Sequence, residues 1–194
     1  MTDATLSIEI QSYWHPGTGR GSGYHLDAIT HTGADGLPRL PGRTLKGLLR
    51  DALYRAEVWG WPETPRGTTD ALFGPRGDGI ETLPGLLRFA DATLPPVVAR
   101  YLASSEGAHL VPGLYREHFS TAIVPKKGVA KQHSLRGMRV VVPLTLQASI
   151  SEVPGLAPIA EWENRLAACF CLVNAVGAHR SRGFGRARLA WKEA

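Results

Sequence analysis

Residues 40–50 read Leu-Pro-Gly-Arg-Thr-Leu-Lys-Gly-Leu-Leu-Arg, and this stretch decides how the rest of the chain is interpreted. Pro41-Gly42 is a turn dipeptide, and Thr44 is predicted to cap the helix that follows. Apolar residues then recur at the three- and four-residue spacing of one buried helical face, namely Leu45, Leu48, Leu49, Ala52, Leu53 and Ala56. The stretch therefore predicts a turn followed by an amphipathic helix.

Three cations, Arg43, Lys46 and Arg50, share another face of this predicted helix. A helix N-terminus already carries partial positive charge, so cations in its first turns oppose the macrodipole. A bound polyanion explains their placement better than helix stability does. An ordinary solvated basic face fits the same pattern, and the stretch alone does not decide between the two interpretations.

The Pro-Gly turn, the Leu45-Lys46-Gly47 run and the following arginine resemble the hallmark of the RAMP superfamily of CRISPR-associated proteins. The resemblance is greatest to the backbone subunits of type III CRISPR effector complexes. Near the C-terminus, residues 177–186 read Gly-Ala-His-Arg-Ser-Arg-Gly-Phe-Gly-Arg, which resembles the glycine-rich loop of the same family. This loop half-matches an RNA-recognition-motif strand, but Arg186 stands where that motif needs an aromatic residue or valine.

Composition and charge favour a compact domain with an acidic partner. The 194 residues are 43% hydrophobic, which suits a single domain spanning residues 1–194. The net charge of +5 is concentrated in two segments: residues 113–145 hold six bases and one acid, and the residues after 176 hold five bases and one acid. Clustered cations of this kind are what a track for nucleic acid requires.

The two cysteines and the hydropathy of the chain predict a cytoplasmic protein. Cys169 and Cys171 lie one residue apart, a spacing that fits neither a zinc knuckle nor a redox pair, and that disfavours a disulfide. They are expected to be buried thiols in a reducing compartment. The chain shows no signal peptide and no apolar run of the roughly 20 residues needed to cross a bilayer, so no membrane partner is expected.

The remaining chain follows the order of an α+β domain. Alternating apolar residues predict a strand at 4–11, and residues 16–23 form a glycine-rich loop whose alternating glycines do not fit a dinucleotide fingerprint. Residues 42–47 do not form a Walker loop, because Leu48 stands where that loop needs a lysine. An irregular inserted loop is expected at 59–85. A strand at 86–92, a short helix at 97–102, a helix at 162–176 and a strand at 187–191 complete a ferredoxin-like (RRM-like) β-α-β-β-α-β core.

A long hairpin is predicted at residues 117–147, inserted into this core. Two apolar ends flank a basic middle that contains Lys126, Lys127 and Lys131. The layout resembles the thumb with which RAMP backbone subunits fold over RNA. An ordinary solvent-exposed hairpin is the alternative, and the excess of bases over acids favours the thumb.

Asp27 follows the glycine-rich loop and lies fourteen residues before Pro41. A lone aspartate near a turn is usually a turn or cap residue. In type III backbone subunits, however, an aspartate at this separation from the hallmark is tied to cleavage of bound target RNA. The resemblance thus implies that Asp27 is catalytic and binds a divalent metal, Mg²⁺ or Mn²⁺, with the RNA supplying most of the ligands. Asp35 has the surroundings of a turn residue.

The resemblance implies a subunit that holds crRNA and meets target RNA and other effector subunits in a self-stacking or hetero-oligomeric complex. The predicted RNA-binding residues are Arg20, Arg43, Lys46, Arg50, Lys126, Lys127, Lys131, Arg136, His179, Arg180, Arg182 and Arg186. Two other functions stay open. One is a metal-independent endoribonuclease that processes crRNA with His25 or His31 as acid and base. The other is a noncatalytic structural subunit.

Overall fold

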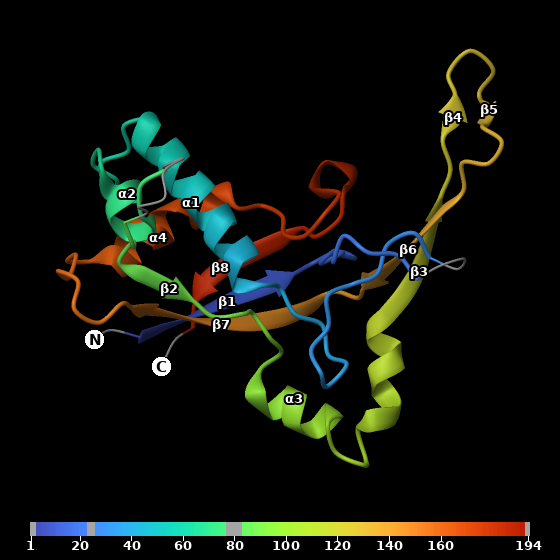
Figure 1. Ribbon diagram of the computed structural model, residues 1–194, viewed down its shortest axis with the longest axis horizontal. Coiled ribbons are helices and arrows are strands. Elements are labelled where there is room, and N and C mark those ends of the chain that lie inside the picture. The colour runs from blue at the N-terminus through green and yellow to red at the C-terminus, as the bar shows by residue number, and fades with distance from the viewer. Residues whose placement is uncertain (1–2, 23–25, 77–82, 193–194) are drawn as a thin grey trace.

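The computed structural model describes residues 3–22, 26–76 and 83–192, and a four-stranded antiparallel sheet forms its centre (Figure 1). The sheet order is β2-β7-β1-β8. The longest pairing joins β1 to β7, from Asp3 opposite Ser151 to Ile10 opposite Leu144. The strands span, in chain order, β1 (Asp3–Ile10), β2 (Leu87–Phe89), β7 (Leu144–Glu152) and β8 (Ala187–Trp191).

Two helices connect these strands and pack against each other (Figure 1). Helix α1 (Gly42–Val58) lies between β1 and β2 in the chain, and α4 (Trp162–Cys169) lies between β7 and β8. The sheet strands and these helices therefore follow the predicted order β-α-β-β-α-β. The α+β class is confirmed, whereas the single-domain range 1–194 stays a prediction.

The core lies between the helices and one face of the sheet, as the apolar patterns predict. Alternate residues of β1 are buried, with Leu6 and Ile8 fully inaccessible. On α1 the predicted stripe is confirmed, because five of its six residues are buried and Leu48 is half-buried. Removing these apolar surfaces from water is the main force that holds the helix on the sheet.

The start of α1 differs from the prediction. Thr44 does not cap the helix, which begins at Gly42 directly after Pro41 and has no side-chain cap from its own segment. Instead the backbone N–H of Gly42 donates a 2.8 Å hydrogen bond to Oδ1 of Asp91, which follows β2. The capping residue lies 49 residues away in the chain. Rules that consider only neighbouring residues could not find it, and they selected the nearest hydroxyl, that of Thr44.

Gly42 is required by close packing, and this gives a stability prediction. A Cβ at Gly42 would lie 2.5 Å from the carbonyl oxygen of Phe89, whereas a Cβ at Gly47 meets nothing within 4 Å. We expect Gly42→Ala to destabilise the fold by about 1–3 kcal/mol, as overpacking does. Gly47→Ala, in the same helix, should instead stabilise it by about 0.5–1 kcal/mol. Denaturant unfolding measures both, and equal effects would contradict the packing argument.

Two predicted segments have different boundaries in the structure. The inserted loop at 59–85 contains a helix, α2 (Thr68–Phe73), whose start is held by hydrogen bonds from Gly67 and Thr69 to the Glu57 carboxylate. The helix predicted at 162–176 ends at Cys169 and continues only as a 3₁₀ turn, η2 (Phe170–Leu172). Residues 174–176 leave the helix because their backbone pairs with residues 185–187.

The short helix predicted at 97–102 is confirmed as α3 (Pro96–Leu102), which is followed by a 3₁₀ helix, η1 (Ala108–Leu114). The predicted strand at 86–92 is confirmed in its centre, as β2. The expectation of two buried thiols is confirmed for Cys169 and wrong for Cys171. Burial raises the pKa of Cys169 to about 11, but Cys171 is exposed, and both are free. None of the described helices is both long and apolar enough to cross a membrane.

The predicted hairpin is present and projects away from the sheet (Figure 1). Strand β3 (Tyr115–Ser120) pairs with β6 (Arg136–Val141), and a short pair, β4 (Ile123–Val124) with β5 (Val129–Ala130), forms the tip. The predicted boundary at residue 147 is wrong, because residues from Leu144 onward belong to the central sheet. The chain passes from hairpin to sheet at Val142-Pro143, and this proline was a signal for the boundary that the prediction did not use.

Candidate nucleic-acid interface

Three segments that are distant in sequence meet at the base of the hairpin and line a pocket of about 250 Å³. One is the loop after the first glycine-rich segment, the second is the β3–β6 ribbon, and the third is the loop before β8. Six of the lining residues carry a charge, an imidazole or an aromatic ring: Asp27, His118, Arg136, His179, Arg182 and Phe184. Four of these six were predicted as site residues from the sequence.

Asp27 is held against β6 by two hydrogen bonds to one residue. Its backbone N–H donates to the carbonyl of Gly137 at 2.8 Å, and its Oδ2 accepts from the N–H of Gly137 at 2.8 Å. Asp27 is exposed at the pocket wall. The hairpin therefore positions the carboxylate, and Arg136 directly precedes Gly137 in β6.

The loop before β8 is placed by two glycines that pack on residues 13–15. Gly177 has φ +80° and Gly185 has φ +70°, and a Cβ at Gly185 would collide with the carbonyl of Val176. The close approach allows Ala178 to donate to the carbonyl of His15 at 2.8 Å and Gly185 to that of Tyr13 at 2.8 Å. The glycines of the predicted glycine-rich loop thus have a structural role, and they fix the position of the residues between them.

Aromatic rings form one side of the pocket. The ring of His118 packs edge-on to Phe184 with centroids 5.1 Å apart, and His179 lies 6.3 Å from Phe184 in a similar arrangement. His179 also has a left-handed backbone, with φ +57°. Such a conformation is uncommon outside glycine and is concentrated at functional positions. Met138 adds a further apolar surface to the lining.

A second pocket, of about 510 Å³, shares Asp27 and His179 with the first pocket and reaches Pro41 and Thr44 at the start of α1. His15 lines it, although only 3% of this residue is exposed. Its Nδ1 lies 2.6 Å from the carbonyl oxygen of Arg139. Because a carbonyl can only accept, Nδ1 carries the proton, and burial lowers the pKa of His15 and favours the neutral ring.

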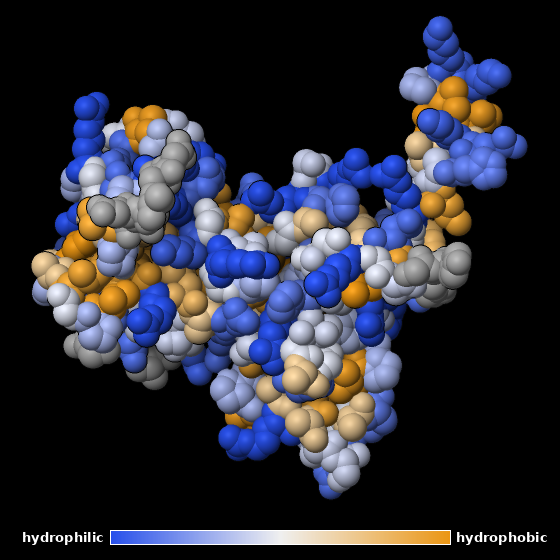
Figure 2. All heavy atoms as spheres, viewed as in Figure 1, coloured by the Kyte–Doolittle hydropathy of each residue, from blue (hydrophilic) through white to orange (hydrophobic). Residues whose placement is uncertain are grey.

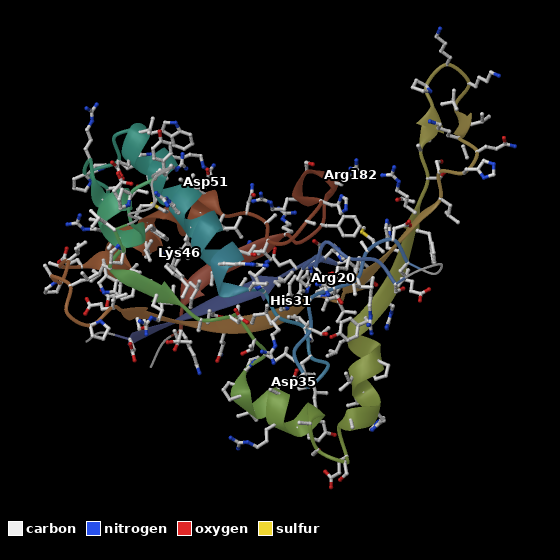
Figure 3. The ribbon with its side chains drawn as sticks, viewed as in Figure 1. Arg20, His31, Asp35, Lys46, Asp51 and Arg182 are labelled. Carbon is white, nitrogen blue, oxygen red and sulfur yellow. The ribbon has the colours of Figure 1, made fainter. Side chains whose placement is uncertain are left out.

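The other predicted cations do not line these two pockets. Arg20 and Arg180 are exposed, as are the three hairpin lysines. Figure 3 shows Lys46 on α1. Arg182 is in the loop before β8, which in this view lies between α1 and the hairpin. Arg43 and Lys46 line a separate pocket of about 370 Å³ together with Arg88. Burial and the nearby Arg50 lower the pKa of Lys46. Arg186 lines another pocket, beside Phe170 and β8.

Arg50 is engaged within the protein. Its guanidinium donates to the carbonyl of Gly74 at 2.8 Å and lies 3.6 Å from the carboxylate of Asp70. These contacts join α1 to α2, so the side chain has a structural role whether or not RNA is bound. Its contribution to RNA binding stays a prediction, as it does for the other cations.

The protein offers few ligands for the predicted metal. Among the described residues, no group of three or more His, Cys, Asp or Glu side chains could hold a metal ion. Mg²⁺ keeps most of its waters and commonly shares phosphate oxygens as ligands. The residues present fit such an ion only if Asp27 supplies a carboxylate and the RNA supplies further oxygens.

Four residues of the two pockets were not predicted as site residues from the sequence: His15, His118, Ser120 and Phe184. His118 and Ser120 alternate on β3 and share its pocket-facing side, a signal that could have been used. His15 and the packing of Phe184 have no local signal, since both depend on contacts with distant segments.

Of the two histidines considered as acid and base, His25 lies outside the described residues, and His31 lines neither pocket. Asp35 is a turn residue as expected, because it accepts a hydrogen bond from the backbone of Leu37.

Comparison with known proteins places this geometry in a family. A profile of the RAMP superfamily matches residues 7–188, and the chain therefore belongs to the RAMP superfamily. Among solved structures, it is similar to a subunit of the type III-B Cmr-beta complex bound to cognate target RNA, with a TM-score of 0.72, 12% identity and coverage of 98% of this chain and 97% of that one.

Two further structures have the same fold. The apo state of type III-B Cmr-beta gives a TM-score of 0.67 at 12% identity, with coverage of 98% of this chain and 97% of that chain. A type IV-B CRISPR complex gives 0.63 at 16% identity, with coverage of 100% of this chain and 91% of the other. A search of curated protein sequences found no match.

Proposed function

We propose that the protein is an RNA-binding subunit of a type III-like CRISPR effector complex and holds crRNA. The observation that carries this proposal is the meeting of Asp27, Arg136, His179 and Arg182 at the base of a basic hairpin. The similarity of the chain to subunits of type III-B and type IV-B complexes supports the same conclusion.

The charge distribution supports contact with a phosphate backbone. The hairpin carries exposed Lys126, Lys127 and Lys131 at its tip and Arg136 at its base. Figure 2 shows hydrophilic residues along the concave edge between α1 and the hairpin, where the loop with Arg182 lies. The hairpin tip, the hairpin base and the loop with Arg182 thus each contribute cations, as a bound strand requires, and such contacts position an RNA without reading its sequence.

The proposal includes assembly with other effector subunits, by self-stacking or in a hetero-oligomer. A projecting hairpin offers a surface for a head-to-tail contact, which propagates instead of closing. The test is to express the chain with its native partner subunits and crRNA, and to purify it through a tag. We expect crRNA and at least one partner to co-purify in an ordered oligomer. A chain that remains monomeric and free of RNA would contradict the proposal.

Cleavage of target RNA is proposed as a second activity of the same surface. Asp27 is placed by Gly137, and Arg136 and Arg182 lie at the same pocket, where they can stabilise charge that develops on a phosphate. A divalent ion, when bound with the RNA, would supply polarisation of the phosphate oxygens. The protein's part is to hold the strand so that a 2′-OH lies in line with the adjacent phosphorus.

A metal-independent endoribonuclease remains the alternative, and His118 and His179 are further candidates for its acid and base beside His25 and His31. His118 and His179 both lie against Phe184 in the pocket, and two imidazoles can share the roles of general base and general acid. Cleavage that persists in EDTA and is lost on substitution of either histidine would favour this function. A purely structural subunit would bind RNA and cleave nothing.

A further inference from the structure

Strand β8 forms one edge of the central sheet, next to β1 (Figure 1). The backbone N–H of Lys192 donates a 2.8 Å hydrogen bond to β1. Backbone groups alternate between the two sides of an antiparallel strand, so those of Leu189 and Trp191 point away from β1. Ala187 also points outward, and its N–H already donates to the carbonyl of Asn174 at 3.0 Å. Within residues 3–22, 26–76 and 83–192, no strand pairs with the outer side of β8 at Leu189 and Trp191.

A groove of about 700 Å³ lies along this open edge, and its lining comes from β8 and from residues in the range 167–174. The indole of Trp191 is fixed in the groove. Its Nε1 donates to the carbonyl of Glu163 at 3.1 Å, and its ring packs edge-on to Phe170 with centroids 5.1 Å apart. The groove therefore offers an apolar surface that is formed before any ligand binds.

The solvent-facing side of β8 carries cations at alternate positions. Arg186, Arg188 and Lys192 are exposed, whereas Ala187 between the first two is buried. On β1, Glu9 lies opposite Arg188, so one acid stands beside three bases on this side of the sheet. A strand added beside β8 places every second side chain next to these cations. Acidic side chains at alternate positions complement them.

We infer that β8 binds an extended, acidic segment of a partner protein, which adds to the sheet as a further strand. Its backbone pairs with that of Leu189 and Trp191, its apolar side chains enter the groove, and its acidic side chains lie beside the cations of β8. The inference goes beyond the proposed function and does not depend on RNA binding. No residue that lines this groove lines the pocket at the hairpin base.

A second copy of this chain is a poorer occupant of the edge. The two edge strands of the sheet, β8 and β2, both carry an exposed arginine, Arg188 and Arg88. Like charges opposite each other on adjacent strands are destabilising, and cations on an edge deter pairing between copies. RNA can satisfy the cations alone, because it has no peptide groups to pair with Leu189 and Trp191. An acidic polypeptide satisfies both features.

The test uses a short fluorescein-labelled peptide that alternates glutamate and valine, titrated with the full chain and followed by fluorescence anisotropy. We expect it to bind, and a peptide with lysine in place of glutamate to bind far more weakly. Arg188→Glu should weaken binding of the acidic peptide about 10-fold, because an attractive cross-strand pair becomes repulsive. The same variant should bind the lysine peptide better than the wild type does, which a misfolded protein would not do. The matched control is Arg88→Glu, on the other edge of the sheet, which should bind like the wild type.

Methylation of the peptide nitrogens separates strand addition from simple charge attraction. The amides of an extended peptide alternate between its two sides, so either the glutamate set or the valine set faces β8. Methylation of that set should abolish binding, and methylation of the other set should leave it intact. Hydrogen exchange at the amides of Leu189 and Trp191 should also slow when the unmethylated peptide is bound.

Three results would overturn the inference: no binding of the acidic peptide, an equal effect of the two methylations, or unchanged exchange at both amides. Displacement of the peptide by single-stranded RNA at equal concentration would assign the cations of β8 to RNA and overturn the protein partner. All four results leave RNA binding by the hairpin untouched, so the inference and the proposed function can fail separately.

Discussion

Asp27→Asn is expected to lower the rate of target-RNA cleavage at least about 100-fold in the reconstituted complex, with RNA affinity nearly unchanged. Asparagine keeps an oxygen where Oδ2 accepts from Gly137, so the loop should stay attached to β6. The negative charge is lost, and with it the ability to bind a divalent ion or to orient an attacking group. The measurement is single-turnover cleavage of matched target RNA with Mg²⁺.

The control is Asp35→Asn, which removes the same charge at a turn outside the pocket. This variant should cleave like the wild type. If Asp27→Asn cleaves at the wild-type rate and pattern, then Asp27 only supports the loop, and the cleavage comes either from the histidines or from another subunit of the complex. Asp27→Ala is a less informative change, because it also removes the hydrogen bond to Gly137.

The patterns that repeat along the sequence predicted the fold best. Period-two alternation located β1, and the stripe that begins at Leu45 located α1, because each records burial of one face. The errors occur where a distant segment supplies the deciding contact. Asp91 replaces Thr44 as the cap of α1, and pairing of residues 174–176 with 185–187 shortens α4.

In the candidate site, too, the sequence predicted individual residues but not the contacts that distant segments supply. Asp27, Arg136, His179 and Arg182 could be selected from local composition and family resemblance, and the structure brings them to one pocket. Their meeting could not be derived from the sequence, because it depends on Gly177 and Gly185 packing against residues 13–15. The packing of Gly177 and Gly185 also positions Phe184, which lies between them in the chain. Arg50 looked like a ligand for a polyanion, yet its guanidinium contacts Gly74 and Asp70.

Removal of the cations along the hairpin is expected to produce the largest loss of RNA affinity. A variant in which five cations are replaced by alanine should lose most of its binding at physiological salt, because each neutralised phosphate releases counterions. The five residues lie at the hairpin tip, at its base and in the facing loop: Lys126, Lys127, Lys131, Arg136 and Arg182. The control is the pair Arg66→Ala and Arg100→Ala, which removes exposed cations outside these segments.

The most direct test of RNA binding along this surface is the salt dependence of affinity for a single-stranded RNA, compared between the wild type and the five-cation variant. Each phosphate contact to a single strand contributes about 0.7 to the log–log slope, so loss of five contacts should flatten the slope by about 3.5. The control pair should leave it unchanged. A wild-type affinity that does not vary with salt, or an identical slope in the five-cation variant, would contradict the proposal that this protein holds RNA along the hairpin and the loop before β8.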